Sequence, residues 1–406
     1  MGSIDPAAAR RDPEPAAAGW LTAALNQGWI YRDRVESGQA GLTALAFYAG
    51  RYRHSSADVW LARLQAGEID RAGRPLGPQE RLASGDQLRW QRPPWREEAV
   101  PLPGPPLWDD GDLLVLDKPA GLPVLPAGGW LEHTLLRILE RRHRQDPAGL
   151  PRPVHRLGRT TSGLLVCARR PATRAWLSRL LRDSTAADQR PEAPPSCLPP
   201  RDLPLMDLPP QNPLWTDCWL TDLPPRDPAA QNPLLSDQLP VEQPPRGSPS
   251  QVPWPACRKL YRALLQPGLV PLQPGESRTL RTAIGRRPHP RLGLVWCAVD
   301  AAEPQALQAC SRLTLLARSP RADLVAVAIA SGRPHQIRIH CAAFGAPLLG
   351  DPLYRAGGGA DPGALPGDGG YRLQAWRLEL TLPTGEPLTL TVQQPLQLEP
   401  AESRDP

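Results

Sequence analysis

Apolar residues along this chain gather in short runs bounded by glycine, proline and charged residues. A run of four to eight apolar residues between turn-forming residues is typical of a buried β-strand. The last two runs flank the sequence PTGEP and therefore predict a β-hairpin. The predicted strands lie in DLLVLDK (residues 112–118), SGLLVCAR (162–169), KLYRALLQ (259–266), LGLVWCAVD (292–300), ADLVAVAIA (322–330), LQAWRLELTL (373–382) and LTLTVQQP (388–395).

Three segments show helical periodicity instead. Residues 55–69 place Val59, Trp60 and Leu64 at helical spacing, with Ser56 as the N-cap and Gly67 near the stop. Residues 132–145 predict an amphipathic helix with Leu135, Leu136 and Leu139 facing inward, and residues 172–183 predict another. Because strands outnumber helices, the sequence predicts an α+β fold built on a mixed, mostly antiparallel sheet.

Composition divides the chain into segments. Residues 1–18 are rich in alanine and proline and predict a disordered tail. Residues 19–100 predict a small module. Its helix followed by G-x-I and its terminal GD-x-L resemble a degenerate S4-type RNA-binding module, and a small structural domain is the alternative. Residues 101–183 and 256–398 predict two parts of one larger domain, separated by an insertion.

The insertion, residues 184–255, is rich in proline. Nineteen of the 54 prolines of the chain lie between positions 191 and 255, in a five-residue repeat that includes MDLPP, TDLPP and VEQPP. A five-residue repeat can build a right-handed β-helix, but proline removes the backbone donors that its ladders need. The segment therefore predicts a disordered, tandemly expanded linker, with a solenoid as the alternative.

The charge of the chain is unevenly distributed. Its formal net charge is +6, while residues 183–255 hold ten acids and four arginines, a net of −6, so the remainder carries +12. A basic body favours a polyanionic partner such as RNA. Only two lysines occur, Lys118 and Lys259, against 45 arginines. Codon bias is the simplest explanation for that ratio. The scarcity of lysine nevertheless draws attention to the two positions at which it occurs.

The cysteines and the apolar runs limit the class of protein. The seven cysteines include no C-x-x-C pair and are odd in number, which disfavours a zinc site or a disulfide framework and favours a reducing, cytoplasmic compartment. The sequence has no run of eighteen apolar residues, so we expect no membrane span. The N-terminal segment lacks the apolar region of a secretory signal.

Four segments in order carry a family resemblance: DLLVLDKPAGLPV, VHRLGRTTSGLLVCAR, KLYRALL and SGRPHQIRIHCAAFGAPLLGDPLY. Together they resemble the four sequence blocks of the RluA-type pseudouridine synthases, over about residues 109–395. The resemblance implies the pseudouridine synthase sheet and an enzyme that isomerises uridine to pseudouridine in ribosomal or transfer RNA. It also implies a flipped-out target nucleotide and no cofactor. We expect a monomer in the cytoplasm.

The same resemblance exposes a departure at Gly158. In the family the fourth residue of H-R-L-D is the reactive aspartate, and here that position is glycine. By resemblance, Arg156 fills the gap left by the flipped nucleotide, Tyr261 stacks on the target base and Arg338 pairs with the catalytic carboxylate. A buried guanidinium without a partner is costly, so Arg338 needs another acid, water or phosphate. The nearest acids by motif are Asp117, Asp323 and Asp351, the last of which also suits a turn.

Further residues of these blocks are candidates for RNA contact. Solvated surface charge is the simpler reading of each arginine and lysine among them. HQIRIH does not match H-E-x-x-H, so we expect no metal site. As a strand this segment would group His335 with Ile337 and Ile339, whereas helical spacing would group Gln336 with His340. The candidate RNA-binding residues are His155, Arg156, Arg159, Lys118, Arg333 and His335.

The sequence thus leaves three hypotheses. The first is an RNA pseudouridine synthase with an unusual active site, and the second is a catalytically silent RNA-binding relative of the same fold. The third is an unrelated α+β domain. The first two predict RNA binding that weakens with salt, and only the first predicts a modified product and requires an acid within reach of the flipped ribose.

Overall fold

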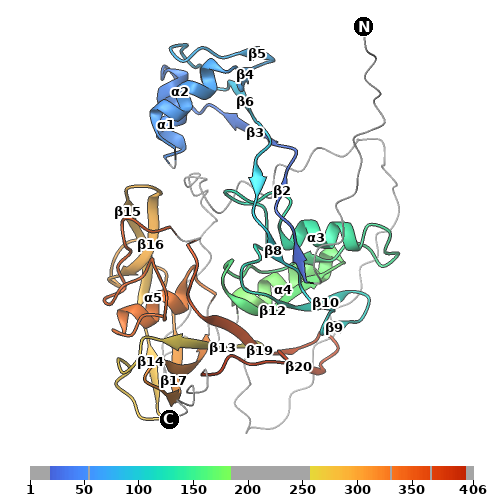
Figure 1. The fold of residues 1–406 in the computed structure, drawn as a ribbon, viewed down its shortest axis with the longest axis vertical. Helices are drawn as coiled ribbons and strands as arrows, with labels where there is room; N and C mark the ends of the chain where they lie inside the picture. The colour runs from blue at the N-terminus through green and yellow to red at the C-terminus, as the bar shows by residue number, and fades with distance from the viewer. Residues whose placement is uncertain (1–18, 54, 184–256, 330–331, 366–367, 399–406) are drawn as a thin grey trace, which may run out of the picture. The chain divides into compact units, whose positions relative to one another are not determined.

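The computed structural model describes residues 19–53, 55–183, 257–329, 332–365 and 368–398 (Figure 1). The predicted disordered tail, residues 1–18, and the whole of the predicted insertion, residues 184–255, lie outside the described residues. The described chain forms two compact units. The smaller unit is residues 30–92, and the larger one contains the described residues on either side of it.

The smaller unit packs two helices on a four-stranded sheet. Helix α1 (Ala44–Arg51) begins at the N-cap Thr43, and α2 (Ala57–Gln65) begins at Ser56, whose side chain accepts the N–H of Val59 as predicted. Trp60 and Leu64 are buried, whereas Val59, at the same helical spacing, is 40% exposed and lies outside the core. The sheet order is β3 (Trp29–Arg34), β6 (Gln87–Arg92), β4 (Ile69–Arg71) and β5 (Arg74–Pro75).

The flanks of the predicted 19–100 module belong to the larger unit. Strands β1 (Trp20–Leu21) and β2 (Ala24–Leu25) pair with β8 (Val100–Pro101) and β7 (Arg96–Glu97). The buried carboxylate of Glu97 accepts backbone N–H groups of residues 131–133, at 2.9–3.1 Å. The compact unit, residues 30–92, is therefore shorter than the predicted module of residues 19–100. The four flanking strands and the contacts of Glu97 belong to the larger unit.

The larger unit is built on a mixed sheet in which β12–β19 is the parallel pair and the other recorded pairs are antiparallel, which confirms the predicted sheet type. The parallel pair joins the chain before the insertion to the chain after it. At this junction Gly163 has a φ of +104°, and a Cβ there would lie 2.2 Å from the carbonyl oxygen of Ala375. Only glycine permits that approach. The strand order is β14 (Ser277–Leu280), β17 (Ser311–Arg318), β18 (Asp323–Ile329), β13 (Cys257–Leu265), β19 (Leu373–Thr381), β12 (Ser162–Ala168), β10 (Leu113–Lys118) and β9 (Trp108–Asp109), with β11 (Arg152–Pro153) on β12 and β20 (Pro387–Thr391) on β19.

Helices and hairpins complete this unit. Helix α3 (Leu135–Arg142) buries Leu135, Ile138 and Leu139, so Ile138 takes the inward position that we had predicted for the half-buried Leu136. Helix α4 is Pro171–Asp183, and α5 is Gln336–Ala343, so the segment HQIRIH is helical rather than extended. The predicted hairpin around PTGEP is present as β19–β20, and β15 (Ala283–His289) and β16 (Gly293–Val299) form a second hairpin.

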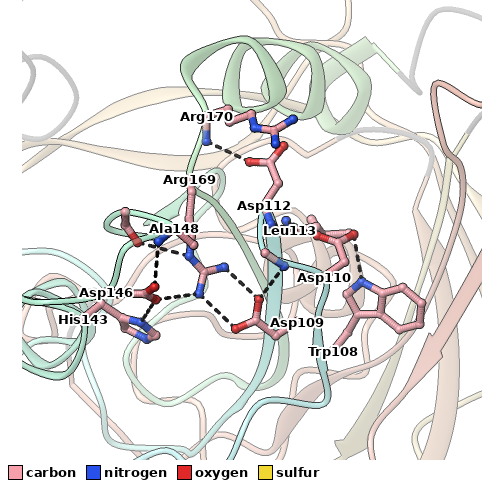
Figure 2. A network of polar contacts seen from close by, with 12 residues as sticks. Trp108, Asp109, Asp110, Asp112, Leu113, His143, Asp146, Ala148, Arg169 and Arg170 are labelled. Carbon is pink, nitrogen blue, oxygen red and sulfur yellow. Dashed lines mark hydrogen bonds and ion pairs between the residues drawn. The ribbon is translucent and has the colours of Figure 1, made fainter.

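A buried arginine braces one end of this sheet (Figure 2). The guanidinium of Arg169 contacts both carboxylate oxygens of Asp109 at 2.8 and 3.0 Å and one of Asp146 at 3.1 Å. Its Nε donates to the carbonyl of Gly149 at 3.1 Å, and His143 contacts Asp146 at 2.9 Å. Arg169 thereby ties β9 to the end of β12 and to the loop that follows α3.

We predict that Arg169→Met lowers the free energy of unfolding by roughly 1–3 kcal/mol, because it removes charge-assisted hydrogen bonds from a nearly buried side chain. Hydrogen bonds from Arg169 lower the pKa of Asp109. The pKa of Asp146 is lowered to about 2, mainly by its hydrogen bond with His143 and to a smaller extent by Arg169. This stabilisation is complete above the ordinary carboxyl pKa of about 4 and is lost as the pH falls towards 2. The difference between native and variant should therefore shrink over that range.

Denaturant unfolding at a series of pH values measures this difference. The neighbouring exposed arginine supplies the matched control, and Arg170→Met should change stability by less than about 0.5 kcal/mol. Equal effects of the two variants at pH 7 would contradict the bracing role of Arg169.

Candidate active site

Three adjacent strands bring the sequence blocks together. Tyr261 on β13 is opposite Ala375 on β19, and Ala375 is opposite Gly163 on β12. The loop that carries Gly158 leads directly into β12. Tyr261 and the glycine loop therefore lie two strands apart at one place in the sheet, which neither block specifies by itself.

A small cavity lies beside Tyr261. Its volume is about 20 Å³, which is room for about one water molecule. Burial raises the pKa of Tyr261 to about 12, so its phenol is neutral at pH 7. Burial, and then the charge of Lys259, lower the pKa of His155 to about 4, and its Nε2 accepts the N–H of Val166 at 3.1 Å. At neutral pH His155 thus has no charge for a phosphate, and it supports the wall of the cavity. The lining residues are His155, Leu164, Leu181, Lys259, Leu260, Tyr261, Ala375, Arg377 and Leu378.

The space beside Gly158 is taken by a tyrosine from another part of the chain. A Cβ placed on Gly158 would lie 2.6 Å from the hydroxyl oxygen of Tyr371 and 3.3 Å from Thr161 Oγ1. The Tyr371 hydroxyl is itself 3.3 Å from Thr161 Oγ1, and its ring is buried. The site therefore requires glycine at position 158, because any larger side chain would displace the Tyr371 phenol.

Arg338, on α5, has a carboxylate partner. Its Nε and Nη2 each donate to Asp351 at 2.7 Å, and both side chains are almost fully buried. Its guanidinium also lies over two aromatic rings, 4.2 Å from the centroid of Tyr371 and 4.9 Å from that of Tyr354. Burial alone would lower the pKa of Arg338, but the hydrogen bonds with Asp351 raise it overall. The guanidinium is thus held as a cation against the face of Tyr371.

Asp351 combines the two roles that the sequence left open. Besides the ion pair, its Oδ1 accepts the N–H groups of Leu353 at 2.9 Å and Tyr354 at 3.2 Å, as expected for a turn residue. The other two acids named from the sequence are placed differently. Asp323 pairs with Arg318 at 3.1 Å, and Asp117 is half-buried on β10 with its pKa raised by burial.

The two lysines of the chain both tie loops together through backbone carbonyls. Lys118 is fully buried, and its Nζ donates to the carbonyls of Pro119 and Leu122 at 2.8 Å and of Arg159 at 3.1 Å. Burial lowers its pKa to about 7. Lys259 Nζ donates to the carbonyl of Leu181 at 2.6 Å. In this structure the Lys118 amine therefore holds the residue after Gly158, which is a structural use rather than the phosphate contact expected from the sequence.

The remaining candidates differ in exposure. Arg156 is exposed, whereas Arg159 is half-buried with its guanidinium 5.8 Å from the ring centroid of Trp130. Arg333 is half-buried and donates from Nε to the carbonyl of Gln308 at 3.1 Å. Arg156 is thus the candidate whose side chain is most open to a large polyanion.

His335 begins α5 with a φ of +54°, and its Nδ1 lies 2.6 Å from the hydroxyl of Tyr354. That hydroxyl already donates its hydrogen to the carbonyl of Trp296 at 2.8 Å, so Nδ1 is the donor to Tyr354. Burial, and then the charge of Arg338, lower the pKa of His335 to about 3. His335 is therefore neutral at pH 7 and orients the tyrosine beneath Arg338.

Tyr371 is the residue that sequence reasoning missed. It follows the fourth block, in GGYRL, and no spacing or motif there distinguishes it from an ordinary residue before a strand.

Among the described residues no cluster of three or more His, Cys, Asp or Glu side chains could hold a metal ion. In the same part of the chain, no helix is both long and apolar enough to cross a membrane.

Comparison with known proteins gives consistent matches. The model of the RNA pseudouridylate synthase family matches residues 112–189. An uncharacterized RNA pseudouridine synthase of Synechocystis is 33% identical over 357 residues, covering 87% of this chain and 94% of the relative. RNA pseudouridine synthase 5 of Arabidopsis thaliana is 30% identical over 404 residues, covering 91% and 92%. Ribosomal large subunit pseudouridine synthase D of Neisseria meningitidis is 26% identical over 309 residues, covering 75% and 60%.

We predict that Gly158→Ala destabilises the native chain but is tolerated once the Tyr371 hydroxyl is removed. In the native chain the added methyl group meets the hydroxyl at 2.6 Å, and overpacking of this kind costs about 1–3 kcal/mol. In a Tyr371→Phe background the nearest ring carbon is 3.9 Å away, which is an ordinary contact.

Thermal or denaturant unfolding of the four proteins in this cycle gives the coupling energy, which we expect to be about 1–2 kcal/mol. Additive effects of the two substitutions would show that the phenol does not occupy the space beside Gly158.

Proposed function

The chain belongs to the RluA-type family of RNA pseudouridine synthases, and from this premise we propose that it isomerises uridine in structured RNA although Gly158 replaces the motif aspartate. The reaction breaks the bond between uracil N1 and ribose C1′, turns the base and joins its C5 to C1′. The C5 hydrogen leaves in the process. We expect no cofactor and a cytoplasmic location.

One observation carries this proposal. Arg338 keeps a buried carboxylate partner, Asp351, and is held against Tyr371 at the Gly158 loop. Tyr261 lies two strands away from that loop, and we propose that its ring stacks on a flipped base, as in the family that the sequence blocks resemble. A charged, hydrogen-bonded and buried arginine at this point favours a site that is still organised for chemistry over one that only binds RNA.

The substrate is proposed to be ribosomal RNA, with transfer RNA as the second candidate. The relative from Neisseria meningitidis is a ribosomal large subunit pseudouridine synthase, and that match supports the first choice. The exposed Arg156 is proposed to enter the stack that the flipped nucleotide leaves, because a planar guanidinium can lie against bases. The alternative function is a catalytically silent RNA-binding protein.

We predict that the purified full chain releases tritium from C5-labelled uridine in ribosomal RNA. We also predict that Arg156→Ala reduces kcat/KM by roughly 5- to 100-fold, in line with the loss of one stacking contact. The measurement is tritium release with time over a series of RNA concentrations and at two salt concentrations.

Arg144→Ala removes another exposed arginine, outside the four blocks, and should leave kcat/KM within about twofold. If the chain binds ribosomal and transfer RNA with the usual salt dependence but releases no tritium from either, the synthase function is rejected and the silent RNA-binding protein is favoured.

A further inference from the structure

A synthase without the motif carboxylate needs another group that can move a proton beside the ribose. Asp351 does not fit this role in its present arrangement. Its side chain is fully buried, and its two oxygens accept four hydrogen bonds, two from Arg338 and two from the backbone. An acid held in this way stabilises a cation and a turn, and it presents no free oxygen to a substrate.

Tyr371 has the required placement. Its hydroxyl lies 2.6 Å from the point where the Cβ of an aspartate at position 158 would be, so the phenol oxygen occupies space that the side chain of that aspartate would need. Gly158 itself is exposed, so the backbone of this loop is accessible to a ribose. The hydroxyl is fixed by Thr161 Oγ1 at 3.3 Å and by the burial of its ring.

Arg338 gives the phenol an electrostatic environment suited to proton transfer. The guanidinium lies 4.2 Å from the ring centroid of Tyr371, and Asp351 and Tyr354 hold it there. A cation over an aromatic face attracts the electrons of the ring, so it stabilises negative charge that develops on the phenol oxygen. Since the side chains of Arg338 and Tyr371 are both buried, this attraction is stronger than at an exposed position.

We propose that Tyr371 is a catalytic residue that replaces the motif aspartate as the proton-transferring group, an inference that rests on the proposed synthase function. When the N1–C1′ bond breaks, both bonding electrons leave with the uracil, and the Tyr371 hydroxyl donates its proton to the base. After the base turns, C5 bonds to C1′. The hydrogen on C5 then passes as a proton to the Tyr371 oxyanion. The product has the same atomic composition as the substrate, the tyrosine regains its proton, and the hydrogen that came from C5 is released when the phenol exchanges it with water.

The test compares tritium release by the native chain, Tyr371→Phe, Gly158→Asp with Tyr371→Phe, and Tyr48→Phe. Tyr371→Phe keeps the ring beneath Arg338 and removes only the hydroxyl, so kcat should fall about 10²- to 10⁴-fold while RNA affinity stays within about threefold. Adding Gly158→Asp should restore a large part of the rate, because without the hydroxyl the new Cβ no longer meets an atom at 2.6 Å and the ring carbon is 3.9 Å away. Tyr48 lies in the smaller unit, and Tyr48→Phe should retain the native rate.

The outcomes separate the two proposals. No release by the native chain rejects the synthase function itself. A native chain that is active and a Tyr371→Phe variant within about threefold of it reject only the role of Tyr371. A loss in Tyr371→Phe that Gly158→Asp does not restore, in a folded protein that binds RNA, also rejects that role and leaves Tyr371 as a positioning residue.

Discussion

The buried ion pair between Arg338 and Asp351 is the interaction on which the site depends. A guanidinium at this depth is stable only with a hydrogen-bonded carboxylate, and Asp351 supplies both oxygens at 2.7 Å. The pair holds Arg338 over the rings of Tyr354 and Tyr371, and the Tyr371 ring carries the hydroxyl beside Gly158. The glycine is therefore one part of an arrangement in which the cation, the phenol and the loop each limit the position of the others.

The surrounding backbone is held by polar groups that the fold has buried and satisfied. Lys118 binds three carbonyls, one of them from the residue after Gly158, so the loop is tied to the end of β10. Gly163 lets β12 approach β19 closely enough to pair, which joins the chain before the insertion to the chain after it. These contacts explain why a chain with so few lysines has one at position 118, since a slender ammonium with three donors fits among three carbonyls and a planar guanidinium does not.

Local patterns were enough to predict most of the strands, the PTGEP hairpin and the helices within residues 55–69 and 132–145, because these depend on neighbouring residues. The errors arose where distant residues decide. The side of α3 that turns inward depends on the sheet it covers, which favoured Ile138 over Leu136. The limits of the smaller unit depend on β1, β2, β7 and β8, which pair with one another and belong to the larger unit. The sequence identified Gly158 as the unusual residue. The residue that fills the space beside it, Tyr371, comes 210 positions after Thr161, whose hydroxyl it contacts.

The same geometry changes what the glycine implies about function. An aspartate at position 158 and a tyrosine at position 371 would overlap, since the first side-chain carbon alone would lie 2.6 Å from the phenol oxygen. A site that had merely lost its carboxylate would contain a gap or water at this point, whereas here a buried phenol fills it. Restoring aspartate at position 158 alone would therefore not rebuild the family arrangement, because Tyr371 would have to leave the face of Arg338. Positions 158 and 371 are best understood as one functional unit, and the chemistry of the site depends on both residues together.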